Sequence, residues 1–215
     1  VKVLAWYRPD ADKKVLEAQQ QYVQKIGDEC AKNDILFLFE LLVYPLSKDL
    51  YQTKEYVEMQ NKKTDHVLES VREFSDKKYG VDVFKLESPV NVNKIADSDL
   101  NAFKEMGNIA GRPWVMLSAG AGKEEFKNVL KLAFKAGCSG FLAGRAIWLD
   151  AFMHYPNWDK IQNQLESNAK DYLDEIGEMA DKSALSWNNH VCYGKDGSDF
   201  PYDNQEFRLH YNEIE

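Results

Sequence analysis

The chain has 215 residues, and its 27 Lys and Arg against 35 Asp and Glu give a formal net charge of −8 at pH 7. This acidic balance argues against a protein that binds nucleic acid through a basic surface, so no nucleic-acid partner is expected. The hydrophobic content of 44% is sufficient for a globular core. The longest apolar run, residues 35–46, is interrupted by Glu40 and is shorter than the roughly 20 residues that span a bilayer, so no membrane partner is expected either.

Five short apolar segments alternate with longer amphipathic stretches. Their β-branched and aromatic residues are typical of strands, whereas the stretches between them place apolar residues three or four positions apart, as helices do. This alternation predicts an α/β fold with a parallel sheet, in which the first segment is a buried strand. Residues 159–186 are expected to form one or two amphipathic helices, and residues 188–215 an irregular tail. The expected strands are residues 1–7, 35–44, 81–87, 114–118 and 140–143.

Cysteines and histidines are both scattered along the chain. Cys30, Cys138 and Cys192 form no Cys-x-x-Cys pair, which predicts free thiols in a reducing compartment and hence a cytoplasmic protein. The four histidines form no metal-binding motif, so the sequence predicts no metal site. Gly122-Lys123 is followed by Glu124 where a nucleotide-binding P-loop requires Ser or Thr, so no nucleotide cofactor is expected.

A lysine interrupts the third apolar segment. Lys85 stands in VDVFKLE, and burial disfavours the charged form of a lysine unless a partner compensates. An amine kept partly unprotonated is a nucleophile that forms Schiff bases with carbonyl carbons. The alternative interpretation is that Lys85 reaches solvent at the strand end or pairs with Glu87.

Two further charged residues interrupt neighbouring apolar segments. Glu40 lies within ILFLFELLVY, where burial favours the protonated carboxyl group and suits it to proton transfer. Lys2 lies in the opening segment, and its alternative is simple exposure near the first residue. If the strands are neighbours, Lys2, Glu40 and Lys85 converge on one site.

The last two apolar segments end in small residues that suit an anion site. Ser118, Ala119 and Gly120 follow the fourth segment, and Gly144 and Arg145 follow the fifth. Small residues let backbone N–H groups at a helix N-terminus approach a phosphate, and an arginine adds a permanent charge. Glycines after strands are also common in plain turns, so the two loops support a phosphate site only when taken together.

These segments together resemble the class I tagatose 1,6-bisphosphate aldolases and the related sulfofructosephosphate aldolases. The resemblance runs from residue 1 to about residue 187 and implies a (β/α)8 TIM barrel that needs no cofactor. It implies cleavage of a ketose 1,6-bisphosphate, such as tagatose 1,6-bisphosphate, to dihydroxyacetone phosphate and glyceraldehyde 3-phosphate. The motifs that carry it are VKVLAWYRPD, FLFELLVYP, VDVFKLESPVN, PWVMLSAG and AGCSGFLAGRAIW.

The resemblance also implies roles for individual residues. Lys85 corresponds to the Schiff-base lysine, Glu40 to the acid/base and Lys2 to an auxiliary lysine. Ser118, Gly144 and Arg145 correspond to residues that hold the 1-phosphate of the phosphosugar substrate, and the loop of Ser118 includes Ala119 and Gly120.

The resemblance implies that this chain contains only part of the family's barrel. The motifs belong to the fourth to eighth strands, so residues 1–187 are expected to form five C-terminal βα units without the first three strands. Five strands cannot close an eight-stranded barrel, so either a further N-terminal segment or a second chain, such as another copy, is expected to complete it.

Four alternative functions remain open from the sequence. They are a sulfofructose 1-phosphate aldolase, a zinc-dependent aldolase, a Schiff-base barrel acting on deoxyribose phosphate or a keto acid, and a non-catalytic phosphosugar-binding barrel.

Overall fold

The strands form one parallel sheet in the order β1-β2-β3-β4-β5. The computed structural model describes residues 1–46, Asp49 and residues 64–194. All five expected strands are present, which confirms the α/β class. Because neighbours in the sheet are also neighbours in the chain, each connection winds in the manner of a barrel. The strands are β1 (Lys2–Trp6), β2 (Leu38–Leu42), β3 (Val83–Leu86), β4 (Trp114–Leu117) and β5 (Phe141–Leu142).

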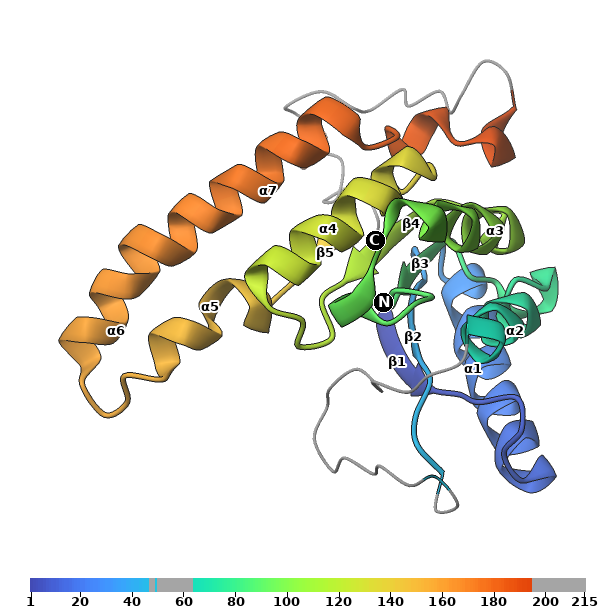
Figure 1. Ribbon diagram of the computed structural model, residues 1–215. Helices are drawn as coiled ribbons and strands as arrows, with labels where there is room; N and C mark the ends of the chain where they lie inside the picture. The colour runs from blue at the N-terminus through green and yellow to red at the C-terminus, as the bar shows by residue number, and fades with distance from the viewer. Residues whose placement is uncertain (47–48, 50–63, 195–215) are drawn as a thin grey trace, which may run out of the picture.

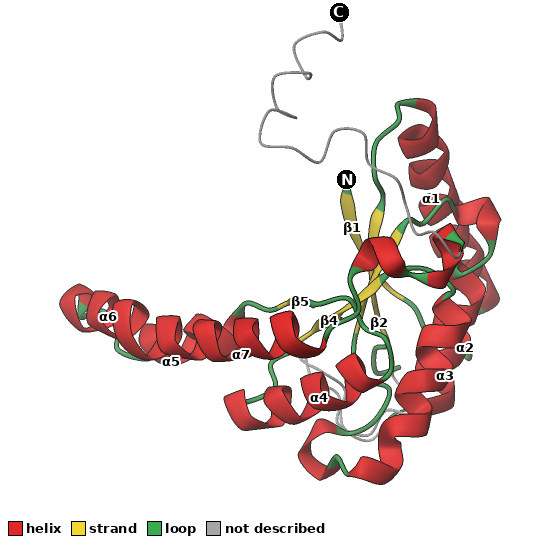
Figure 2. Cartoon of the chain, turned by 90° about the horizontal axis from the view of Figure 1, so that it is seen from above, coloured by secondary structure: helices red, strands yellow, loops and turns green. Residues whose placement is uncertain are grey.

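A helix follows each of the first four strands. Figures 1 and 2 show these helices along one side of the sheet, whereas the last three extend away from it. No helix in the described residues is long and apolar enough to cross a membrane. The helices are α1 (Lys13–Lys32), α2 (Thr64–Phe74), α3 (Leu100–Ala110), α4 (Lys123–Lys135), α5 (Arg145–Phe152), α6 (Trp158–Gln164) and α7 (Lys170–Ser183).

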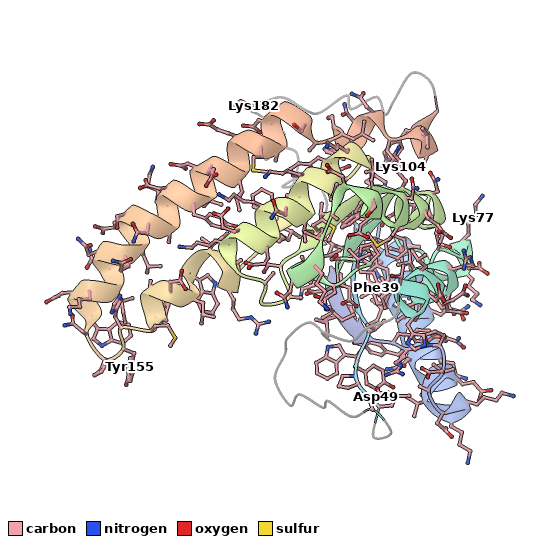
Figure 3. All side chains as sticks on the ribbon, in the orientation of Figure 1. Phe39, Asp49, Lys77, Lys104, Tyr155 and Lys182 are labelled. Atoms are coloured by element: carbon pink, nitrogen blue, oxygen red, sulfur yellow. The ribbon has the colours of Figure 1, made fainter. Side chains whose placement is uncertain are left out.

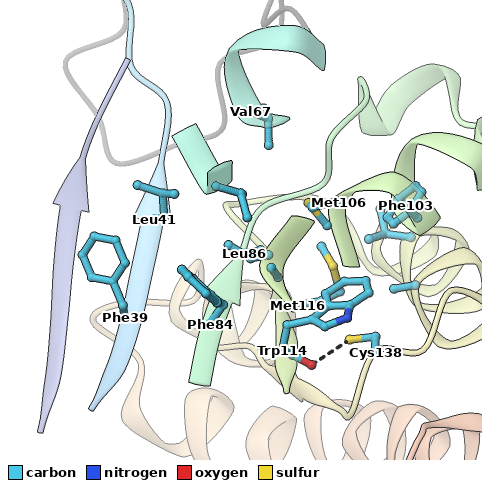
Figure 4. Close-up of a cluster of buried hydrophobic side chains, with 14 of the residues drawn as sticks. Phe39, Leu41, Val67, Phe84, Leu86, Phe103, Met106, Trp114, Met116 and Cys138 are labelled. Carbon is cyan, nitrogen blue, oxygen red and sulfur yellow. Dashed lines mark hydrogen bonds between the residues drawn. The ribbon is translucent and has the colours of Figure 1, made fainter. Parts of the chain in front are cut away.

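The core lies between the sheet and the first four helices. Side chains on alternate strand positions point to the same face, and those on the helix side are almost all apolar. Figure 4 shows this side of the sheet packed against the helices, with the Sγ of Cys138 donating a hydrogen bond to the carbonyl oxygen of Trp114 at 3.4 Å. Cys30 and Cys138 are buried free thiols, as expected, and Cys192 is an exposed one. The strand residues of this core include Phe39, Leu41, Phe84, Leu86, Trp114 and Met116.

The opposite face of the sheet is mixed in character. Partners in a parallel register share a face, and the pairs Leu4↔Glu40 and Glu40↔Lys85 therefore place the three strands' charged and apolar side chains side by side. A small apolar cluster of Leu42, Leu117 and Ala119, with Leu4 packed against it, covers part of this face.

The prediction that residues 1–7 form a buried strand was wrong for β1. Lys2 and Trp6 are exposed, and only Ala5 within β1 is buried. The cause is its position: β1 is at the edge of the sheet and pairs with β2 on one side. Exposure at one edge is what distinguishes it from the central strands, which have a neighbour on each side.

The expected helices over residues 159–186 are α6 and α7, joined by a π-helical turn over Leu165–Ala169. Beyond them, the short 3-10 turns Trp187–Asn189 and Val191–Tyr193 begin the expected tail. His190, which lies between these two turns, is buried. Residues 195–215 of the expected tail lie outside the described residues.

Candidate active site

The two lysines and the glutamate converge as expected. Glu40 lies at the centre of β2, where its side chain is 3% exposed, and each carboxylate oxygen has its own cation. Oε2 is 2.8 Å from Nζ of Lys2, and Oε1 is 3.0 Å from Nζ of Lys85. The Lys85 side chain is 16% exposed and that of Lys2 is 53% exposed. Lys85 is therefore the amine held in the interior, and Lys2 the one that reaches the carboxylate from the edge.

The alternative that Lys85 pairs with Glu87 was wrong. Lys85 pairs with Glu40 on the neighbouring strand, whereas the buried Oε1 of Glu87 accepts a hydrogen bond from the backbone N–H of Val43 at 2.6 Å. The register explains the choice, because Glu40 and Lys85 are direct partners across β2 and β3. Side chains opposite each other on neighbouring strands lie closer together than side chains two residues apart on the same strand.

The loop after β4 has the tight backbone expected of an anion site. Ala119 and Gly120 both have positive φ angles, 44° and 83°, and Ser118 is buried. The carbonyl oxygen of Ser118 accepts a hydrogen bond from the N–H of Ala121 at 2.7 Å, which closes the turn before α4. An alanine in the left-handed region is held at a cost of about 1 kcal/mol. The surrounding structure therefore enforces this turn.

The loop after β5 leads directly into a helix. Gly144 is the N-cap residue of α5 and Arg145 is its first residue. A Cβ atom on Gly144 would lie 3.3 Å from Nε1 of Trp148, so a larger residue would press on the indole.

A pocket of about 250 Å³ joins these elements. Glu40 and Lys85 line it together with residues of both loops, so six of the eight predicted site residues lie at this pocket. Lys2 and Gly120 do not line it; Lys2 is paired with Glu40, and Gly120 follows Ala119 in the turn. The lining residues are Glu40, Lys85, Leu117, Ser118, Ala119, Leu142, Gly144, Arg145 and Trp148.

Sequence reasoning missed the apolar wall of this pocket. Leu117 and Leu142 are register partners in β4 and β5, and Trp148 is three residues after Arg145 on the same helix. Helical spacing from Arg145 is the signal that could have identified Trp148. The pocket thus combines two cationic side chains and one carboxylate with apolar and aromatic surface, a composition that suits an anionic ligand with a carbon skeleton.

Arg8 organises the adjacent end of the sheet without lining the pocket. It is buried, and its guanidinium forms ion pairs with Asp10 and Asp49 and donates to the carbonyl oxygen of Tyr44 at 3.2 Å. Figure 3 shows Asp49 beside the end of the sheet where β1 and β2 finish. Arg8 therefore ties together the segments that follow these two strands.

Comparisons with known proteins show the family to which the chain belongs. A family model described as DeoC/LacD family aldolase matches residues 1–150. The chain belongs to the DeoC/LacD family of aldolases. The matched region includes all eight predicted site residues, and in the described residues no group of three or more His, Cys, Asp or Glu could hold a metal ion.

Two relatives in this aldolase family illustrate the similarity. Tagatose 1,6-diphosphate aldolase 1 of Enterococcus faecalis is 32% identical over 199 residues, which cover 86% of this chain and 60% of that protein. Tagatose 1,6-diphosphate aldolase of Listeria monocytogenes is 30% identical over 202 residues, covering 87% of this chain and 59% of that protein. The chain thus spans about three fifths of the length of these curated relatives.

Solved structures identify the fold as that of TIM-barrel aldolases. A fructose-bisphosphate aldolase from Slackia heliotrinireducens superposes with a TM-score of 0.57 at 12% identity, covering 96% of this chain and 56% of that chain. An archaeal fructose-1,6-bisphosphate aldolase, whose catalytic Lys is bound to the carbinolamine intermediate, has a TM-score of 0.53 at 14% identity and covers 83% of this chain and 57% of that chain. The predicted barrel architecture and family resemblance are confirmed.

Proposed function

We propose that the protein is a class I aldolase that cleaves a ketose 1,6-bisphosphate, such as tagatose 1,6-bisphosphate, to dihydroxyacetone phosphate and glyceraldehyde 3-phosphate. The observation that carries this proposal is the amine of Lys85, 3.0 Å from the buried carboxylate of Glu40 inside the pocket. Family membership supports the aldolase reaction, and the names of the curated relatives favour tagatose bisphosphate as substrate. The free thiols favour a cytoplasmic enzyme.

In this mechanism Lys85 is the nucleophile. Its neutral amine attacks the keto carbon, and the carbonyl oxygen takes a proton from Glu40 to give a carbinolamine. Glu40 then accepts the nitrogen proton and returns it to the departing hydroxyl group, so that water leaves and an iminium forms. Glu40, by then a carboxylate, accepts the proton of the C4 hydroxyl group as the C3–C4 bond breaks. The electron pair of that bond moves toward the iminium nitrogen, and the aldehyde leaves. The enamine is protonated at C3 and hydrolysed, which releases dihydroxyacetone phosphate and restores Lys85.

Lys2 has an electrostatic role in this proposal. The proton that the catalytic amine loses passes to Glu40, and each time Glu40 gives that proton on to the substrate it is again a buried carboxylate, now without its inner cation. Nζ of Lys2, 2.8 Å from the other carboxylate oxygen, keeps Glu40 paired throughout.

The two loops position the substrate. The left-handed turn at Ala119 and Gly120, the Ser118 side chain, and the α5 start at Gly144 and Arg145 would bind the 1-phosphate. Fixing the phosphate next to Lys85 places the keto group at the amine, which converts imine formation into an effectively intramolecular step.

Borohydride trapping tests the proposal. We expect reduction of a mixture of protein and dihydroxyacetone phosphate to fix a covalent adduct on Lys85, located by peptide mass spectrometry. Lys85→Met should abolish the adduct, whereas Lys2→Met, which removes the other lysine at Glu40, should leave Lys85 as the labelled residue. A wild-type protein with no adduct on Lys85 would refute Schiff-base chemistry here, and a substrate panel of tagatose, fructose and sulfofructose phosphates would define the sugar.

A further inference from the structure

Glu87 is a buried carboxylate that the proposed mechanism does not use. It lies directly after β3 and is 1% exposed. A buried carboxylate is costly unless hydrogen bonds satisfy it, and Oε1 of Glu87 accepts one from the backbone N–H of Val43 at 2.6 Å. Val43 is the first residue after β2. The contact therefore joins the carboxyl ends of the two strands that carry Glu40 and Lys85.

The contact stands in place of a backbone hydrogen bond between β2 and β3. The register of β2 and β3 ends at the pair Leu41↔Leu86, whereas β1 and β2 continue through a backbone hydrogen bond from Tyr7 N–H to the carbonyl oxygen of Leu42 at 2.9 Å. At the end of β2, the side chain of Glu87 takes the place that a backbone acceptor would occupy.

We propose that Glu87 is a positioning residue that fixes the distance between Lys85 and Glu40. Glu40 and Lys85 are the register pair just before the last one, Leu41↔Leu86. Separation of the strand ends would therefore move their side chains apart directly. Their Nζ–Oε1 distance of 3.0 Å is a hydrogen-bonding distance that a shift of about 1 Å would break. Displacement on that scale in an active site costs about 100-fold in rate.

The proposed role depends on the acceptor oxygen that Glu87 offers to the Val43 N–H. Glu87 acts through the backbone of β2, since the ion pair of Lys85 is with Glu40. An isosteric glutamine keeps a carbonyl oxygen for Val43 N–H, whereas leucine fills similar space and offers no acceptor. The two substitutions therefore separate the hydrogen bond from simple packing.

The test is the rate at which borohydride traps dihydroxyacetone phosphate on Lys85. We expect Glu87→Gln to stay within about threefold of wild type and Glu87→Leu to trap ten- to 100-fold more slowly, with faster hydrogen exchange at the Val43 amide. Met106→Ala, a core substitution in α3, is the matched control, because it should lower stability without changing the trapping rate below the melting transition.

This inference rests on the proposed function, and the experiment separates the two. A wild-type protein that forms no adduct refutes the aldolase proposal. A wild-type protein that traps, with a Glu87→Leu variant that traps equally fast, refutes the role of Glu87; so does a Glu87→Gln variant as slow as Glu87→Leu. Should Glu87→Leu fail to fold, Glu87→Asp decides instead, because it keeps the charge but withdraws the oxygen from Val43, and wild-type trapping by that variant overturns the proposal.

Discussion

The charged pair at the centre of the sheet should have a measurable stability signature. At 3.0 Å and an effective dielectric constant of 20, the attraction between Lys85 and Glu40 is about 5 kcal/mol. Desolvation of the nearly buried carboxylate offsets much of it, and Lys2 remains beside Glu40 when Lys85 is removed. We therefore expect Lys85→Met to lower the free energy of unfolding by about 2–3 kcal/mol. Lys2→Met should lower it by about 0.5–1 kcal/mol, because that side chain is half exposed.

A double-mutant cycle isolates the pair. In a Glu40→Gln background the carboxylate is absent, so Lys85→Met should cost little, and the coupling energy from urea unfolding should be about 2 kcal/mol. Equal costs of Lys85→Met in the two backgrounds would refute the inference that the pair stabilises the fold. A double variant more stable than wild type, yet unable to trap substrate, would show that the charges are kept for chemistry at the expense of stability.

Three further predictions follow from other parts of the structure. Gly27→Ala should destabilise the protein by about 3 kcal/mol or more in urea unfolding, because the new Cβ would lie 2.0 Å from the backbone oxygen of Tyr79, and an unchanged midpoint would contradict this packing. The hydrogen bond from Arg8 lowers the pKa of Asp49 below its usual value of 3.8. The stabilisation that this carboxylate contributes is therefore full above pH 3.8 and is lost as the pH falls through the pKa of Asp49 in the folded protein. Arg8→Met should reduce the loss of unfolding free energy on acidification, measured by urea unfolding at several acidic pH values. Native protein should react with one equivalent of a thiol reagent, at Cys192, and unfolded protein with three, so three fast-reacting native thiols would be inconsistent with the buried core.

The strands and their order could be predicted because the apolar segments are short and clearly bounded. Helix-facing positions such as Phe39, Phe84 and Met116 are uniformly apolar, and that regularity is what hydrophobic periodicity detects. Charges inside such segments stand out for the same reason, which is why Glu40 and Lys85 were found without a structure.

Partners across strands could not be predicted from the sequence. Glu87 is the carboxylate nearest to Lys85 along the chain. Only the register of β2 and β3 shows that Lys85 pairs with Glu40 instead. The exposure of Trp6 depends on the position of β1 at the sheet edge, which no local pattern encodes. Pairings and edges are properties of the assembled sheet.

The two faces of the sheet explain why the register is so well determined. A slip of one residue between β2 and β3 would turn Lys85 toward the helices and Phe84 toward the pocket, because successive side chains alternate between faces. The lysine would then be desolvated in an apolar core with no carboxylate opposite it, while Phe84, which is fully buried, would lose its packing. The apolar face thus excludes the one-residue slips on either side of the register in which Lys85 meets Glu40. The packing that stabilises the fold also holds the distance that the proposed chemistry requires.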